Sequence, residues 1–255
     1  MEGDDLASFL ASPVDLDNFI AAVTATADAV RAERGATKRI HLSVDEWNVW
    51  YQHRAESHPP SGDDWPVAPV LLEDRYSVAD AVVVGGLLIT LLRNTDRVHV
   101  ATLAQLVNVI APIMTEPGGR AWRQTTFHPF ALTAEHARGE VLQIGFDDVP
   151  TTPTERFGEV PLIDAVVTYD ASDGSAAVFV VNRSVEGATD VELNLAGLGD
   201  LEVVEALTLA DDDPFRVATP ADELAPRVNR AVTSADGVLR LELPAVSWTV
   251  VRLQG

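Results

Sequence analysis

The sequence predicts an α/β segment followed by an antiparallel β domain. Up to about residue 146, helix-like and strand-like segments alternate, which is the pattern of βα units around a parallel sheet. Beyond about residue 160, extended runs are joined by tight turns, which is the pattern of a β-sandwich or jelly roll. Proline and threonine are frequent between residues 147 and 161. We therefore place a boundary there and predict two domains, residues 1–146 and 147–255.

The first domain is predicted to hold five elements in the order helix, strand, helix, strand, helix: residues 15–35, 39–47, 78–93, 98–103 and 119–137. Apolar residues recur at helical spacing in the first of these, with Asp15 as the expected N-cap and Gly35 as the expected stop. This amphipathic pattern indicates a helix that lies on another element.

The second predicted helix, residues 78–93, is apolar nearly all round. Ser77 and Asp80 form a capping-box pattern at its start. A helix that is hydrophobic on every side must be buried. Gly85 and Gly86 within it indicate close packing against a neighbour, because no lysine or further glycine completes a phosphate-binding motif.

The second domain is predicted to contain β-hairpins. Two extended runs between residues 164 and 181 flank Ser172-Asp173-Gly174. Leucines alternate with polar residues from Leu239 to Leu243, directly after Asp236-Gly237. Asp-Gly pairs between alternating runs are strong signals for tight hairpin turns.

Composition restricts the classes of partner. Thirty-nine acidic residues against eighteen basic ones give a formal net charge of −21, which argues against nucleic acid and against an anionic membrane. The chain has no cysteine, and its apolar runs are too short to cross a bilayer. We expect a cytoplasmic protein. Lys38 is the only lysine, and the acidic residues are spread along the chain, so we also expect stability to rise with salt.

The stretch "HLSVDEWNVWYQ", residues 41–52, ends a predicted strand in a carboxylate. Ile40, Leu42, Val44 and Glu46 share one parity, so Glu46 is expected to follow a buried row and to lie where the strand leaves the core. In parallel α/β folds this edge carries functional residues. Two interpretations follow: Glu46 is a catalytic carboxylate beside aromatic walls for a sugar ring, or it is a solvated acid and the tryptophans Trp47 and Trp50 are core residues.

Other chemistries have weaker support. The six histidines show no metal-ligand spacing, and no serine-nucleophile motif is present. His53 and His58 fall in a loop rich in proline and glycine, where they are candidates for a ligand contact or ordinary surface residues. We therefore expect neither a metal nor a cofactor.

The motif "HLSVDEWNVWY" resembles the nucleophile motif of the α-L-arabinofuranosidases of glycoside hydrolase family 51. The similarity continues through residues 80–130 and, more weakly, to "LPAVSWTVVRL" near the C-terminus. By this resemblance Glu46 is the catalytic nucleophile, and Gln105 of the motif "AQLVN" lines the sugar site. Trp50 and Trp65 resemble family aromatics near the pocket. The implied substrates are arabinose-containing oligosaccharides.

The resemblance also implies a partial (β/α)8 barrel. A complete barrel needs roughly 250 residues, whereas only about the first 150 here are α/β. The family's acid/base lies in an Asn-Glu motif on an earlier strand, and no such motif precedes residue 40. Asp45 is not expected to replace it, because adjacent strand residues point to opposite faces.

We therefore expect the chain to consist of the last part of a barrel and a C-terminal β domain. Two functions stay open: part of a retaining arabinofuranosidase, or a non-catalytic remnant or carbohydrate-binding β module. The expected partners are further copies of the chain or the missing N-terminal barrel half.

Overall fold

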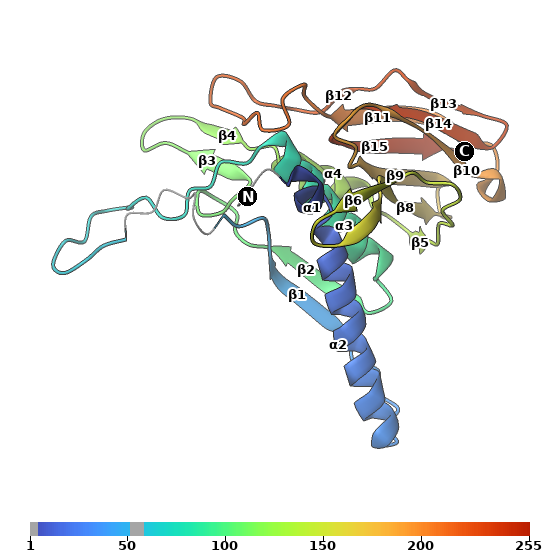
Figure 1. Ribbon diagram of the computed structural model, residues 1–255, viewed down its shortest axis with the longest axis horizontal. Coiled ribbons are helices and arrows are strands. Elements are labelled where there is room, and N and C mark those ends of the chain that lie inside the picture. Colours follow the sequence, from blue (N-terminus) through green and yellow to red (C-terminus); the bar gives the residue numbers. More distant parts are fainter. Residues whose placement is uncertain (1–4, 52–58) are drawn as a thin grey trace.

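The computed structural model describes residues 5–51 and 59–255, and it joins a small helix-rich part to two packed β-sheets (Figure 1). The elements of the first part are α1 (Leu6–Leu10), α2 (Pro13–Glu33), β1 (Leu42–Trp47), α3 (Val78–Arg93), β2 (Val98–Leu103), β3 (Ile113–Thr115), β4 (Ala121–Arg123) and α4 (Phe127–His136). No helix in the described ranges is long and apolar enough to cross a membrane.

β1 and β2 form a parallel pair, and α3 connects them. Leu42 lies opposite Val98 and Trp47 lies opposite Leu103. This confirms the predicted βαβ arrangement and places the C-terminal ends of the two strands at one edge. Parallel neighbours require a crossover of this kind, because a short turn cannot return the chain to the same end of the sheet.

α2 begins earlier than the sequence predicted. Ser12 is its N-cap and Pro13 its first residue, so Asp15 lies in the first turn and is not the cap. Proline fits this position because the first amide of a helix has no intrahelical partner. The predicted stop is confirmed: the helix ends at Glu33, and Gly35 has a φ of 59°, a left-handed conformation suited to the residue after a helix.

α3 is the central helix of the molecule. The predicted capping box is present, with the Ser77 side chain accepting from the Asp80 amide and the Asp80 carboxylate accepting from the Ser77 amide. Gly85 and Gly86 do mark close packing: a Cβ on Gly85 would lie 2.1 Å from Cδ1 of Trp248, and one on Gly86 would lie 2.7 Å from Cγ of Pro13. These two glycines let the β-sheet and the start of α2 approach α3 closely on two different sides.

The predicted helix over residues 119–137 is wrong in its first half. β3 and β4 pair as an antiparallel hairpin around Pro117 and Gly118, whose φ is 67°, and α4 starts only at Phe127. A turn that contains proline and a left-handed glycine cannot continue a helix. The helical pattern from Phe127 onward was therefore extended too far toward the N-terminus.

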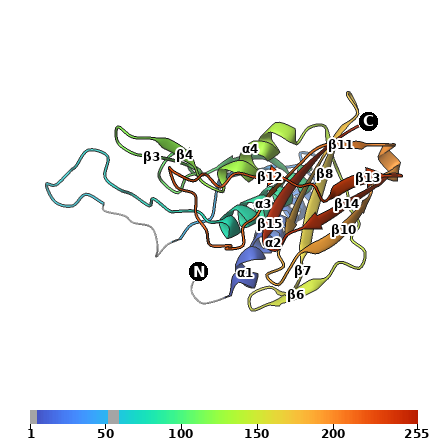
Figure 2. The ribbon, with the colours of Figure 1, turned by 90° about the horizontal axis from the view of Figure 1, so that it is seen from above.

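Two antiparallel sheets make up the rest of the fold (Figure 2). The six-stranded sheet has the order β12-β11-β15-β9-β8-β5, and the three-stranded sheet has the order β10-β14-β13. Their strands are β5 (Glu140–Leu142), β8 (Ile163–Asp170), β9 (Ser175–Asn182), β10 (Thr189–Asn194), β11 (Glu202–Leu209), β12 (Arg227–Val228), β13 (Val232–Ala235), β14 (Val238–Leu243) and β15 (Ser247–Gln254). β6 (Thr151–Thr154) and β7 (Gly158–Pro161) form a separate hairpin, and a short 3-10 helix spans Ala196–Leu198.

Both predicted hairpins are confirmed. β8 and β9 pair across residues 171–174, and β13 and β14 pair across Asp236 and Gly237. Asp236 and Gly237 have φ angles of 52° and 72°. Two consecutive positive φ values are typical of the turn that matches the twist of a hairpin.

The six-stranded sheet is covered on both faces. One face packs on the three-stranded sheet, where Val178 and Val251 meet Leu239 and Leu241. The other face packs on α3, with Phe179 and Trp248 in that core. This double burial explains why β8, β9 and β15 are buried along nearly their whole length rather than at alternate residues.

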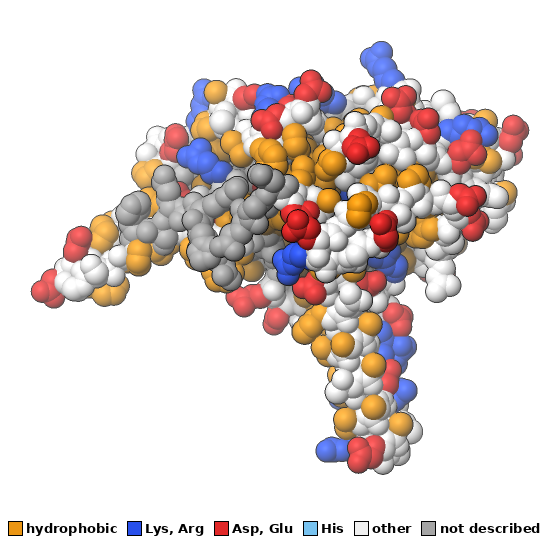
Figure 3. Space-filling view, viewed as in Figure 1, with side chains coloured by type: hydrophobic (Ala, Val, Ile, Leu, Met, Phe, Trp, Pro, Cys, Tyr) orange, Lys and Arg blue, Asp and Glu red, His pale blue; other side chains and the backbone are white. Residues whose placement is uncertain are grey.

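One side of the helical part carries exposed apolar residues. The outer half of α2 projects from the body, and Figure 3 shows hydrophobic side chains along it. Ile20 of the predicted apolar face is buried, but Phe19 is 64% exposed and Val30 is 42% exposed, so the face is only partly covered by the described residues. A groove of about 560 Å³ with apolar walls runs between the second half of α2 and Ile40. β1 is also an edge strand, because β2 is its only partner within residues 5–51 and 59–255.

Candidate active site

Glu46 lies near the C-terminal end of β1 with an exposed side chain. Two further hydrogen bonds join the ends of β1 and β2. The Thr102 hydroxyl donates to the Asp45 carbonyl at 2.9 Å, and the Ala104 amide donates to the Trp47 carbonyl at 3.1 Å. The Glu46 carboxylate therefore lies at a strand end that hydrogen bonds from β2 hold in place. It is open to a substrate.

The buried row predicted to lead to Glu46 is only partly present. Leu42 and Val44 are half-buried, but Ile40 is 54% exposed, and the register shifts between Val44 and Trp47. After this shift Trp47 is the buried residue, at 7% exposure, and its ring packs near Phe130. Simple alternation fails because an irregularity in the ladder changes which side chains face the core.

Trp50 and Trp65 are both exposed, at 53% and 74%. Of the two tryptophans considered as core residues, only Trp47 is one. The Trp65 indole donates to the Gly62 carbonyl at 3.0 Å, which orients its ring within the loop after residue 58. His53 and His58 lie outside the described residues.

Gln105 lies two residues after the end of β2 and is exposed. Its backbone amide donates to the Ile110 carbonyl at 3.1 Å, so the chain turns back on itself after the strand. No hydrogen bond links the side chains of Glu46, Gln105, Trp50 and Trp65 to one another within the described ranges. The pairing of β1 with β2 brings the segments of Glu46 and Gln105 to the same edge.

Asn48, two residues after Glu46, is a site residue that the sequence analysis missed. Its side-chain amide donates to the carbonyls of Ala104 at 2.7 Å and Ile110 at 2.6 Å, and its oxygen accepts from the Val49 amide at 2.8 Å. It thus joins the end of β1 to the loop that carries Gln105. The available signal was a single amide side chain among aromatic residues in "DEWNVWY".

Buried acids support this segment from the side of α3. The Tyr51 hydroxyl donates to Asp80, the Tyr51 amide donates to Asp74 at 3.1 Å, and the Tyr76 hydroxyl donates to the Val49 carbonyl at 2.7 Å. Asp74 and Asp80 are 2% and 1% exposed. Both also line a cavity of about 280 Å³.

Burial dominates the electrostatics of these groups. It raises the pKa of Asp74 and of Asp80 above the ordinary carboxyl value, against the hydrogen bonds from Tyr51 and Ser77, which favour the charged form. Burial and the two nearby carboxyls also raise the pKa of Tyr76, so its hydroxyl stays protonated as a donor. This network fixes the backbone after Glu46.

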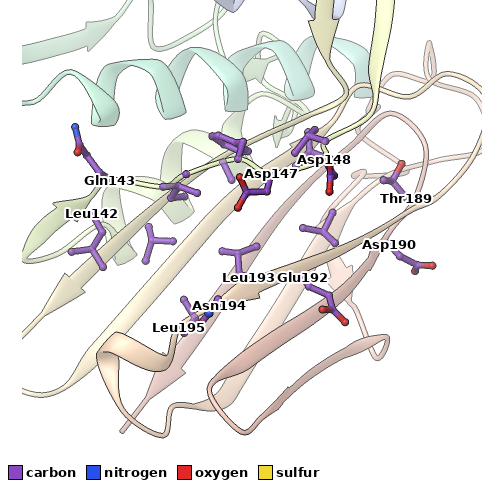
Figure 4. A pocket seen from close by; sticks show the side chains of 18 of the residues that line it. Leu142, Gln143, Asp147, Asp148, Thr189, Asp190, Glu192, Leu193, Asn194 and Leu195 are labelled. Atoms are coloured by element: carbon purple, nitrogen blue, oxygen red, sulfur yellow. The ribbon is translucent and has the colours of Figure 1, made fainter.

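A larger cleft lies in the sandwich and is lined by none of these residues. It has a volume of about 530 Å³ between β10, β8 and the loop after β5, and aliphatic side chains such as Leu142 and Leu193 line it beside Asp147 and Asp148 (Figure 4). Over residues 5–51 and 59–255, no group of three or more histidine or acidic side chains is arranged to hold a metal ion.

Comparison with known proteins gives one family. A model described as the alpha-L-arabinofuranosidase C-terminal domain matches residues 45–247. An exo-alpha-(1->6)-L-arabinofuranosidase of Bifidobacterium longum is 51% identical over 98% of this chain, and an intracellular exo-alpha-(1->5)-L-arabinofuranosidase of Streptomyces lividans is 51% identical over 97% of it. The chain spans 49% and 37% of these relatives.

Solved structures agree in fold. A family 51 α-L-arabinofuranosidase from Bifidobacterium longum matches 99% of this chain with a TM-score of 0.91 and 43% identity, and the match covers 50% of that protein. A family 51 arabinofuranosidase from Xanthomonas axonopodis pv. citri matches with a TM-score of 0.78 at 23% identity, which supports the fold alone.

Proposed function

Because the chain belongs to the family of α-L-arabinofuranosidase C-terminal domains, in the C-terminal portion of glycoside hydrolase family 51, we propose that it supplies the nucleophile-bearing half of a retaining α-L-arabinofuranosidase. The proposed reaction releases terminal non-reducing α-L-arabinofuranose from arabinan or arabinoxylan oligosaccharides. The observation that carries the proposal is the exposed carboxylate of Glu46 at the end of a parallel strand, beside the strand that leads to Gln105.

In the proposed mechanism the Glu46 carboxylate attacks the anomeric carbon, and the bond to the leaving-group oxygen breaks. A second carboxylic acid, about 5 Å from the first in retaining enzymes, gives its proton to that oxygen. The same group then takes a proton from water, which attacks the anomeric carbon and frees Glu46. In our proposal, the second acid comes from a preceding Asn-Glu segment and not from Asp45.

Gln105, Trp50 and Trp65 are proposed to bind the sugar. An amide side chain can both donate to and accept from sugar hydroxyls, and the faces of tryptophan rings pack against apolar sugar faces. The exposure of both tryptophans leaves their rings accessible. This proposed chemistry uses no metal and no cofactor.

We propose that residues 1–146 are the last part of a (β/α)8 barrel and that residues 147–255 form a β-sandwich of jelly-roll type. The β1-α3-β2 unit supports the first assignment, and the two packed antiparallel sheets support the second. β5 pairs with β8, so the first domain also adds an edge strand to the sheet of the second.

The proposed partner is the missing N-terminal barrel half, alone or within an assembly of several copies. The free edge of β1, the exposed Phe19 and the groove beside Val30 lack a neighbour among the described residues. Unpaired strand edges and apolar patches of this kind favour association. Several relatives are named intracellular enzymes, and we propose a cytoplasmic location on that basis.

The experiment is an assay with 4-nitrophenyl α-L-arabinofuranoside. The chain is measured alone and after co-expression with the upstream half of the Bifidobacterium longum relative that is 51% identical to it. We expect neither burst nor turnover from the chain alone, because sugar-positioning groups are missing besides the acid, and we expect turnover from the pair. Glu46→Gln should abolish it, whereas Glu202→Gln, an exposed control on β11, should not.

Activity of the assembled pair that survives Glu46→Gln would reject the proposal. If the chain alone released nitrophenol, and this release depended on Glu46, the chain would instead contain a working active site by itself.

A further inference from the structure

The Asn48 side chain spans the two strand ends of the candidate site. It lies in the chain two residues after Glu46 and donates both amide hydrogens to the segment after β2. One acceptor is the carbonyl of Ala104, the residue directly before Gln105. The other is the carbonyl of Ile110, which also accepts a hydrogen bond from the backbone amide of Gln105. Both contacts of Asn48 therefore bear on the peptide units around Gln105.

The loop held by Asn48 is itself closed by hydrogen bonds. The Ile110 amide donates to the Leu72 carbonyl at 2.9 Å, and the Asn108 side chain accepts from the Thr115 amide at 2.7 Å. These bonds anchor the far end of the loop to other segments. At the end near Gln105, the Asn48 side chain links the loop to the Glu46 segment, beside the backbone bond from the Ala104 amide to the Trp47 carbonyl.

An asparagine suits this position for a chemical reason. A primary amide has two N–H donors and one carbonyl acceptor, and here all three functions are used by two carbonyls and the Val49 amide. A carboxylate of the same shape would place negative charge against two carbonyl oxygens. An alanine would leave those carbonyls without this donor.

We propose that Asn48 is a positioning residue, which sets the place of Gln105 relative to Glu46 and so aligns the sugar with the nucleophile. This inference rests on the proposed function of Glu46 and Gln105. Asn48 acts through Gln105 and touches neither the sugar nor the reacting atoms. Misplacement of a substrate by about 1 Å can cost roughly a hundredfold in rate, so a loosened Gln105 loop should lower kcat/KM.

The test is a double-mutant cycle in the assembled enzyme, the chain together with the upstream half of the Bifidobacterium longum relative. Asn48→Ala, Gln105→Ala and the double variant are compared by kcat/KM for 4-nitrophenyl α-L-arabinofuranoside. We expect Asn48→Ala to lower kcat/KM by about 10- to 100-fold. If Asn48 acts through Gln105, the double variant should be no slower than Gln105→Ala by itself, because the two changes are coupled. Asn194→Ala, an exposed change on β10, is the matched control.

Two results would overturn the inference. One is a double variant whose loss of kcat/KM equals the product of the two single losses. The other is a fully active Asn48→Ala variant when Gln105→Ala is impaired. A Gln105→Ala variant with normal activity, or an active Glu46→Gln variant, would instead reject the proposed function, so the two failures are distinguishable.

Hydrogen exchange on the same variants separates positioning from general stability. Asn48→Ala should speed exchange of the Gln105 amide while the amides of β9 stay protected. Asn48→Ser, which keeps one donor, should show an intermediate loss of activity. Unfolding of both Asn48 variants would assign Asn48 to folding and overturn the positioning role.

Discussion

Gly85→Ala tests the packing of α3 on the six-stranded sheet. The added Cβ would lie 2.1 Å from Cδ1, 2.8 Å from Nε1 and 3.0 Å from Cγ of Trp248. Trp248 is fully buried, so its ring cannot move into solvent. The contact joins the helix that connects β1 to β2 with the face of the six-stranded sheet that packs on it.

The expected magnitude combines two opposing terms. Overpacking a well-filled core typically costs about 1 to 3 kcal/mol, and an overlap this deep belongs at the upper end. Replacing glycine by alanine inside a helix returns about 1 kcal/mol. We expect a net loss of about 2 kcal/mol in the free energy of unfolding, which corresponds to roughly 4 to 8 °C in Tm for a chain of this size.

The assay is thermal and urea unfolding of Gly85→Ala beside Gly86→Ala. The neighbouring glycine gains the same helix propensity, but its new Cβ would meet the ring edge of Pro13 at 2.7 Å, which can adjust by a change of pucker. We expect Gly86→Ala to be close to neutral. Trp248→Phe should partly rescue Gly85→Ala, and it removes an indole N–H that has no hydrogen-bond partner within the described residues. Equal stability of the two alanine variants would refute this account of the packing.

Three further predictions concern pH, salt and association. Burial lowers the pKa of His128 to about 4 from 6.5, so the folded state holds it neutral, and its contribution to stability is complete above pH 6.5 and is lost as the pH falls toward 4. Between pH 7 and 5 the free energy of unfolding should fall by about 2 kcal/mol from this source. Urea titrations at several pH values should show that His128→Gln lacks this fall, whereas an unchanged pH dependence would exclude His128 as its source. With a net charge of −21, Tm should rise as KCl is added up to molar concentration, and a flat or falling Tm would rule out self-repulsion as a limit on stability. The chain alone should associate through its uncovered side, and Phe19→Ser with Val30→Ser should shift sedimentation toward the monomer, so a strictly monomeric parent chain would contradict the unpartnered surface.

Local chemical signals predicted much of the fold from the sequence. The capping box of Ser77 and Asp80 located the start of α3, and Asp236-Gly237 located a hairpin, because each depends on a few neighbouring residues. The double-glycine pair correctly indicated close packing, although its partner Trp248 lies far along the chain. Sequence spacing can reveal that a surface is crowded without revealing what crowds it.

The errors arose where tertiary context decides. The register shift after Val44 could not be read from alternation, because a bulge depends on the partner strand. The hairpin before Phe127 resembled the start of a helix until its turn at Gly118 was seen to be left-handed. Asn48 was missed because its acceptors, Ala104 and Ile110, lie 56 and 62 residues away in sequence. Glu46 and Gln105 were assigned by resemblance, and their roles stay predictions.

The most direct test of the central claim is covalent labelling of Glu46. The assembled enzyme is treated with an arabinofuranose-configured epoxide, which a nucleophilic carboxylate opens to form a stable ester, and the digested protein is examined by peptide mass spectrometry. The account predicts a single ester on Glu46, prevented by excess arabinose and absent in Glu46→Gln. Labelling of another carboxylate of this chain, with Glu46 unmodified and activity lost, would contradict it.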